Sequence, residues 1–173
     1  MRRNAMFAVT AMCLVSLGLV LTATDAVAQQ KSIKDQLVGT WTVVSWDQVR
    51  ADGSKVQRFG GNPKGINAFD SNGRFFVMFA RPDLPKIASR DPLKTTTEEN
   101  KAIMEGTIAY YGTYSVSEPD KVLTLRIEAS SFPNQVGADQ KRTITELTGD
   151  QLKYENTTVM SGGQIHVALS RLK

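Results

Sequence analysis

The chain has 173 residues, a formal net charge of +4, 41% hydrophobic residues, one cysteine and one histidine. This length suits one domain with its own hydrophobic core, and 13 glycines with only 6 prolines argue against a collagen-like or globally disordered chain. A lone cysteine and a lone histidine exclude a disulfide framework and a zinc site built from several such ligands.

The first 28 residues have the pattern of a secretory signal peptide. Arg2 and Arg3 are followed by an apolar segment over residues 5–21, and then by Ala26-Val27-Ala28. A basic start, an apolar run and an A-x-A end are the three parts of such a signal. A retained transmembrane anchor is the alternative, but about 17 apolar residues are at the lower limit for a membrane span. We therefore expect cleavage after Ala28 and a periplasmic or secreted protein.

Cleavage would leave a working domain of residues 29–173, with 145 residues and a net charge of +3, because two arginines and one aspartate are removed. Cys13 is removed as well, so thiol chemistry is excluded from the mature chain. His166 alone does not make a zinc site, and we expect no metal, no cofactor and no membrane anchor. The remaining basic residues are scattered, whereas a nucleic-acid surface needs them clustered, so no nucleic-acid partner is expected.

Most of the remaining chain alternates between apolar and polar residues, with turn signals every 8 to 12 residues or so. This pattern is typical of all-β domains. The segment 74–80 (RFFVMFA) is so apolar that we expect it to be buried on both faces. The predicted strands run from residue 41 to a turn at 51–54, and then over 55–59, 65–69, 74–80, 107–116, 122–129, 141–147, 151–159 and 164–172.

Residues 81–99 interrupt this alternation. The stretch contains three prolines, and long irregular loops in compact domains are often functional. Threonines at 95–97 are N-cap candidates, and two glutamates follow them. They predict a short helix that extends to about Glu105 and stops at Gly106. A shorter helical turn is expected over 32–36.

The segment 107–116 places Tyr110 and Tyr114 on one face with Ile108 and Val116. Two interpretations of this face are open. The tyrosine rings and hydroxyls can line a ligand cavity, or they can be ordinary core residues.

The segment 122–129 places Arg126 and Glu128 on the face opposite three aliphatic residues. This favours an outward, solvated pair that contributes little to stability. The alternative is a buried polar pair, together with Arg142 from the next strand.

Eight or nine strands joined by short turns favour sequential antiparallel pairing. We predict an all-β, antiparallel up-and-down barrel with one short helix, since closure of the sheet removes exposed strand edges. An eight-stranded barrel is wide enough for one small ligand. A jelly roll or an immunoglobulin-like sandwich is the second choice.

The motif Leu37-Val38-Gly39-Thr40-Trp41 resembles the G-x-W opening of lipocalin-like barrels. Further segments, in chain order, are similar to the bacterial and fungal lipocalin-like domain family, whose members are calycin-type β-barrels. These segments are residues 78–83 (MFARPD), 109–114 (AYYGTY) and 131–134 (SFPN), with Gly137, Asp139, Gln140 and Arg142. The resemblance implies a fold but no specific activity.

The resemblance also implies how the barrel is closed. In lipocalin-like barrels the opening tryptophan lies across the closed end, often under a basic side chain from the last strand. Gly39, Trp41 and Arg171 occupy the corresponding positions here. We therefore predict that the Arg171 guanidinium contacts the indole of Trp41, an interaction worth about 0.5–2 kcal/mol.

The candidate ligand-binding residues are Phe79, Tyr110, Tyr114, Arg81 and Arg142. Arg81 opens the long loop and can bind an acidic group of a ligand, or it can support the loop. Arg142 likewise either faces a ligand or organises the neighbouring loop at residues 132–137.

The favoured function is an exported protein that binds a small, mostly apolar molecule in the barrel lumen. One alternative is an isomerase- or cyclase-type enzyme, which would need Tyr110, Glu128, Arg142 and His166 to converge. Another is a structural envelope protein without a ligand. The scarcity of cysteine and histidine favours binding over a thiol- or metal-dependent enzyme, and the sequence has no G-x-S-x-G, P-loop or dinucleotide-binding motif.

Overall fold

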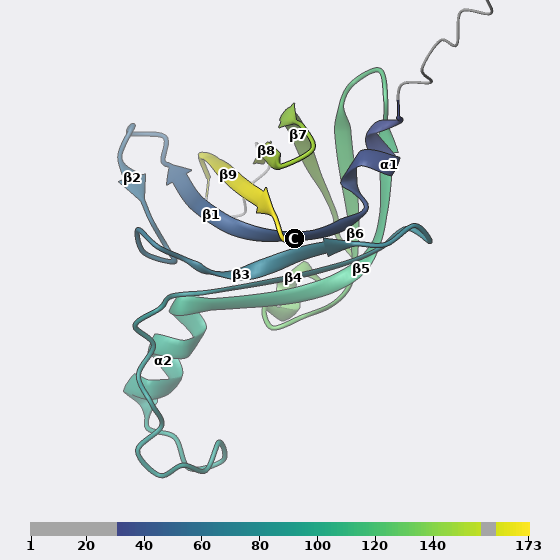
Figure 1. Cartoon of the computed structure of the whole chain (residues 1–173). Helices are drawn as coiled ribbons and strands as arrows, with labels where there is room; N and C mark the ends of the chain where they lie inside the picture. The colour runs from purple at the N-terminus through teal and green to yellow at the C-terminus, as the bar shows by residue number, and fades with distance from the viewer. Residues whose placement is uncertain (1–30, 157–161) are drawn as a thin grey trace, which may run out of the picture. The chain divides into compact units, whose positions relative to one another are not determined.

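Strands make up most of the structure, a computed structural model that describes residues 31–156 and 162–173 (Figure 1). The predicted signal peptide, residues 1–28, lies outside the described residues, as does the end of the strand predicted over 151–159. None of the described helices is long and apolar enough to cross a membrane.

The elements are α1 (Ile33–Leu37), β1 (Gly39–Val49), β2 (Lys55–Val56), β3 (Lys64–Phe69), β4 (Arg74–Ala80), α2 (Thr97–Gly106), β5 (Thr107–Ser117), β6 (Val122–Ser130), the 3₁₀ turn η1 (Pro133–Gln135), β7 (Asp139–Leu147), β8 (Gln151–Asn156) and β9 (Gln164–Arg171).

The sheet closes on itself through β1. This strand pairs with β3 along one edge and with β9 along the other, while β3 to β9 pair in chain order, each antiparallel to the next. In the described residues β1 and β3–β9 form a closed eight-stranded barrel, and β2 is an extra strand on β1. The predicted up-and-down antiparallel barrel with one short helix is confirmed.

The strand predicted over 55–59 is wrong beyond Val56. Residues 57–60 turn instead, with the Gly60 N–H donating to the Gln57 carbonyl. Arg58 donates hydrogen bonds to carbonyls at the end of α2, and Phe59 is buried in the core. These two side chains hold the segment in place through hydrogen bonds and burial.

The expectation that residues 74–80 are buried on both faces is also wrong. Phe75, Val77 and Phe79 are buried, whereas Phe76 and Met78 are 38% and 45% exposed. An antiparallel barrel wall has its core on one side only, and in the described residues nothing covers the outside of β4.

Helix α2 agrees with its prediction because its signals are local. Thr96 caps the helix with a complete capping box, in which its side chain accepts from the Glu99 N–H and Glu99 accepts from the Thr96 N–H. The backbone N–H groups of Ala88 and Thr96 lower the pKa of Glu99. Figure 1 shows α2 and the preceding loop beside the last residues of β4 and the first residues of β5.

The inner faces of β5 and β6 fill the core as their alternation predicts. Tyr110 and Tyr114 are buried on β5, and the aliphatic residues of β6 are buried opposite. Arg126 points outward and pairs with Asp139 at 3.2 Å, and Glu128 pairs with Arg74 at 2.7 Å. The outward interpretation of Arg126 and Glu128 therefore holds, and the buried pair is wrong.

Trp41 closes one end of the barrel and is fully buried. Its indole N–H donates to the Leu37 carbonyl at 2.9 Å, which ties the ring to α1. The guanidinium carbon of Arg171 lies 4.0 Å from the centre of the ring, so the predicted contact is confirmed. Gly39 makes room for it, because a Cβ there would lie 2.6 Å from Arg171 Nη1.

Candidate ligand-binding pocket

A cavity of about 560 Å³ lies at the end of the barrel opposite Trp41. It is lined by the last residues of β1, β4 and β8 and the first residues of β5, β7 and β9, which meet at this end because the strands are antiparallel. Its volume is within the range of small-molecule sites. The lining residues are Trp46, Gln48, Arg58, Phe59, Phe79, Ile108, Tyr110, Phe132, Gln135, Gln140, Arg142, Asn156 and Ile165.

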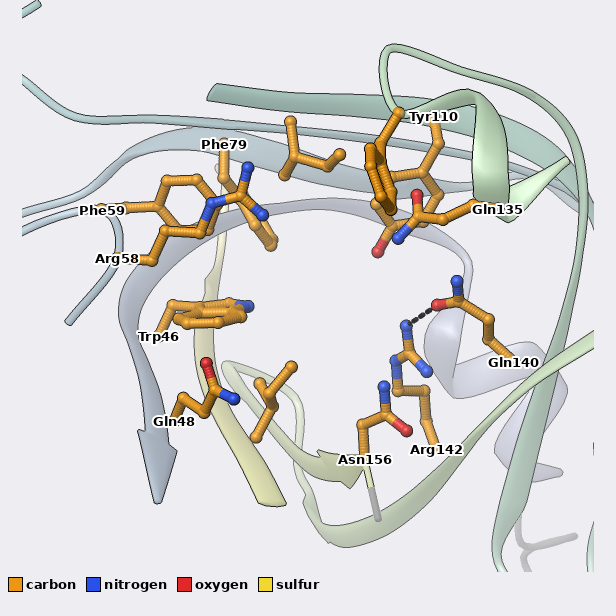
Figure 2. Close-up of a pocket in the computed structure, with 13 residues that line it drawn as sticks. Trp46, Gln48, Arg58, Phe59, Phe79, Tyr110, Gln135, Gln140, Arg142 and Asn156 are labelled. Carbon is orange, nitrogen blue, oxygen red and sulfur yellow. Dashed lines mark hydrogen bonds between the residues drawn. The ribbon is translucent and has the colours of Figure 1, made fainter. Parts of the chain in front are cut away.

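One wall of the pocket is aromatic (Figure 2). The rings of Trp46 and Phe59 meet edge to face, with centroids 5.1 Å apart, and Phe59 meets Phe79 in the same manner at 6.0 Å. The ring of Tyr110, which also lines the pocket, packs against the ring of Phe75, with the two centroids 5.9 Å apart. Edge-to-face packing is a favourable arrangement for aromatic pairs, so this wall offers a stable apolar surface to a ligand.

The opposite wall is polar and is centred on Arg142 of β7 (Figure 2). Arg142 is only 5% exposed. Its guanidinium donates to Gln140 Oε1 and to the Lys141 carbonyl, and lies 5.9 Å from the centre of the Tyr154 ring. Strand alternation explains the position, since Arg142 and buried Ile144 are two residues apart on the inner face of β7.

Two buried polar residues lie behind Arg142. Asn67 Nδ2 donates to the Tyr154 hydroxyl at 3.4 Å, and Asn67 Oδ1 has no hydrogen-bond partner among the described residues. Burial raises the pKa of Tyr154, although the nearby charge of Arg142 and the hydrogen bond from Asn67 favour its ionised form. Tyr154 is therefore a neutral phenol at physiological pH.

Arg58, the second arginine of the pocket, has a structural role. It donates to the carbonyls of Met104, Glu105 and Thr107 at 2.9–3.1 Å. Two of these carbonyls belong to the last turn of α2, where the helix dipole is negative. Burial lowers the pKa of Arg58, but these acceptors compensate much of its charge.

Comparison with known proteins agrees with this geometry. A family model for a lipocalin-like domain matches residues 38–169. The chain belongs to the lipocalin-like domain family. No curated protein matches it.

Solved structures similar to this lipocalin-like domain share little sequence with it. A lipocalin-like protein from Bacteroides uniformis is 11% identical, with a TM-score of 0.45, over 79% of this chain and 99% of that one. A de novo designed fluorescence-activating β-barrel is 13% identical, with a TM-score of 0.43, over 83% and 100%. A redesigned β-barrel bound to the compound DFHBI is 18% identical, with a TM-score of 0.41, over 82% and 100%.

The lipocalin-like domain brings together three of the five residues predicted to bind a ligand. Phe79, Tyr110 and Arg142 line the pocket. Tyr114 lies near the closed end, where its hydroxyl donates to the Asp70 carbonyl at 2.8 Å. Arg81 lies outside the pocket and forms a two-pronged ion pair with Asp83, with distances of 3.0 and 2.8 Å.

Sequence reasoning did not find Trp46, because Trp41 and Trp46 are an odd number of residues apart. In a regular strand they would face opposite sides. A β-bulge between Val43 and Ser45 shifts the register by one residue, so both tryptophans point inward. Among the strand pairs of the described residues, the shift is seen in the register of β1 against β9.

The residues proposed for catalysis do not converge in the lipocalin-like domain. Tyr110 and Arg142 line the pocket, whereas Glu128 pairs with Arg74 on the outside of the barrel. His166 lies next to Glu155 on the neighbouring strand, with 3.2 Å between Nδ1 and Oε1, and does not line the pocket. In residues 31–156 and 162–173 no three metal-binding side chains cluster either.

Proposed function

We propose that this lipocalin-like domain is an exported protein that binds one small, mostly apolar molecule in the pocket. The observation that carries the proposal is the cavity of about 560 Å³, with an aromatic wall on one side and converging polar groups on the other. Ligand sites combine a large apolar surface with a few placed polar groups that set orientation.

An uncharged lipophilic dye, Nile red, tests the proposal. We expect saturable binding at one site, with a rise in dye fluorescence. The substitution Ile165→Trp fills the pocket from β9 and should weaken binding by about tenfold or more. The matched substitution Met78→Trp places the same side chain on the outer face of β4, where Met78 is exposed, and should leave binding unchanged.

Equal binding by the protein and by Ile165→Trp would contradict a ligand site in the lumen. Loss of binding in Met78→Trp, with Ile165→Trp unaffected, would assign the dye to the outside of the barrel. Thermal unfolding of both variants shows that each retains the fold.

Export is proposed from the sequence of residues 1–28. We expect the protein recovered from the periplasm or the medium to begin at Gln29, as measured by intact mass. A cell-associated protein that retains residues 1–28 would contradict this part of the proposal.

A further inference from the structure

The lining of the pocket is unbalanced in charge. It contains two arginines, Arg58 and Arg142, and neither aspartate nor glutamate. A concave site with low-dielectric walls and charges of one sign concentrates a field that attracts the opposite sign. The cavity therefore favours an anion over a cation or a neutral molecule of the same shape.

Arg58 does not need a ligand to compensate its charge. Its three carbonyl acceptors include two at the negative end of α2. Figure 2 places it beside Phe59 and Trp46, across the cavity from Arg142.

Arg142 has no such compensation. It is 5% exposed, and no carboxylate lies within ion-pair distance of it in the part of the chain that the structure describes. Its acceptors are the neutral oxygens of Gln140 and Lys141. Arginine does not lose its proton in proteins, and a buried unpaired charge is costly. A counter-charge from outside the chain would relieve this cost.

The hydrogen-bond donors around Arg142 suit a carboxylate. Two of its five N–H groups are used by Gln140 and the Lys141 carbonyl. Gln140 accepts through Oε1, and in the described residues no hydrogen bond from its Nε2 is found. A planar guanidinium fork matches the two oxygens of a carboxylate. One negative charge balances one arginine, whereas a phosphate of nearly two charges would leave an excess.

We propose that the ligand is an amphipathic carboxylic acid whose carboxylate binds Arg142 and whose apolar body lies against the Trp46–Phe59–Phe79 wall. This inference rests on the proposed function, because it concerns the same pocket and defines the chemical class of its ligand. Arg142 and Gln140 set the position of the head group, and the aromatic wall selects the body.

The first experiment uses the unmodified protein and two probes of equal chain length, dodecanoate and dodecanol. Isothermal titration calorimetry should show dodecanoate binding roughly 10- to 100-fold more tightly than dodecanol, since a hydrogen-bonded charge is gained. Dodecanoate affinity should fall toward that of dodecanol as the pH drops through the carboxyl range near 4 to 5 or so, while dodecanol affinity stays constant.

The second experiment uses variants. Arg142→Gln should weaken dodecanoate binding by about 10- to 100-fold and leave dodecanol nearly unaffected, and Arg142→Lys should be intermediate. The control Arg126→Gln removes an exposed arginine on the outside of β6 and should change neither affinity. Because the two probes are compared on unmodified protein first, the proposal stays testable if Arg142→Gln does not fold.

Equal affinities for dodecanoate and dodecanol would overturn the carboxylate proposal and leave the proposed function standing. If a folded Arg142→Gln variant bound dodecanoate as tightly as the unmodified protein, the carboxylate proposal would also be overturned and the proposed function would stand. Absence of binding by both probes and by Nile red would overturn the proposed function and this inference together.

Discussion

Replacing Arg171 by methionine would remove the charge that covers Trp41 while keeping an apolar stem over the ring. In the protein, Arg171 Nη1 donates to the Val38 carbonyl at 2.9 Å and Nη2 to the Gln36 carbonyl at 2.6 Å. Its Nε donates to the Gly149 carbonyl. One side chain thus joins β9, α1 and the β7–β8 turn at the closed end.

The expected loss follows from these contacts. The cation–π contact at 4.0 Å contributes about 0.5–2 kcal/mol, and each of the three hydrogen bonds, two part-buried and one exposed, contributes about 0.5–1 kcal/mol net. The variant Arg171→Met should therefore lose about 2–5 kcal/mol of unfolding free energy. Arg171→Lys keeps the charge, but a compact ammonium does not reach three carbonyls, so its loss should be about half as large.

Urea denaturation followed by circular dichroism measures this loss, with an unchanged m-value as the sign that only stability has changed. The control Arg126→Met removes an exposed ion pair and should cost less than about 1 kcal/mol. If Arg171→Met were no more destabilised than Arg126→Met, the closed end would not depend on Arg171, and our account of barrel closure would be refuted.

Two further predictions concern backbone packing and pH. Gly65 has φ +142°, and a Cβ there would lie 1.9 Å from the Met78 carbonyl oxygen. Gly65→Ala should therefore lower the free energy of unfolding by about 3 kcal/mol or more, as measured by thermal unfolding. The control Gly149→Ala adds a Cβ in open space and should lower it by less than about 0.5 kcal/mol. Burial raises the pKa of Tyr154 in the folded protein above the ordinary value of 10.0, which the residue has in the unfolded chain. Above about pH 10 the unfolded chain loses this proton more readily than the folded protein, so the contribution of Tyr154 to stability decreases as the pH rises. The stability difference between the protein and Tyr154→Phe should therefore shrink above about pH 10 in denaturant titrations, and a constant difference would contradict a buried phenol.

The local features of the fold were predictable from sequence. Alternation identified the buried faces of β5 and β6, because side chains of a strand point alternately to opposite sides. The start of α2 follows from a capping box, which acts within a few residues, and its last residue is Gly106, where the sequence predicts the stop. The contact between Trp41 and Arg171 followed from the family resemblance, although the two residues lie at opposite ends of the barrel sequence.

The composition of the site was only partly predictable. Arg81 and Arg142 were both candidate ligand-binding residues, and of the two the sequence assigned an acidic ligand group only to Arg81. Arg81 is neutralised by Asp83 outside the pocket, whereas Arg142 points into it without an acidic partner among the described residues. That difference depends on which carboxylates come close in space, and spacing along the chain does not determine it.

The sequence by itself determined that the chain is rich in antiparallel strands and has only one cysteine and one histidine, because these conclusions need only residue counts and a period of two. Only the tertiary structure decided that the lumen is open, that Trp46 faces it, and that Arg142 lies buried in its wall. An open lumen depends on how side chains from many strands and loops fill one shared volume. A one-residue bulge in β1 is enough to change which of them enter it.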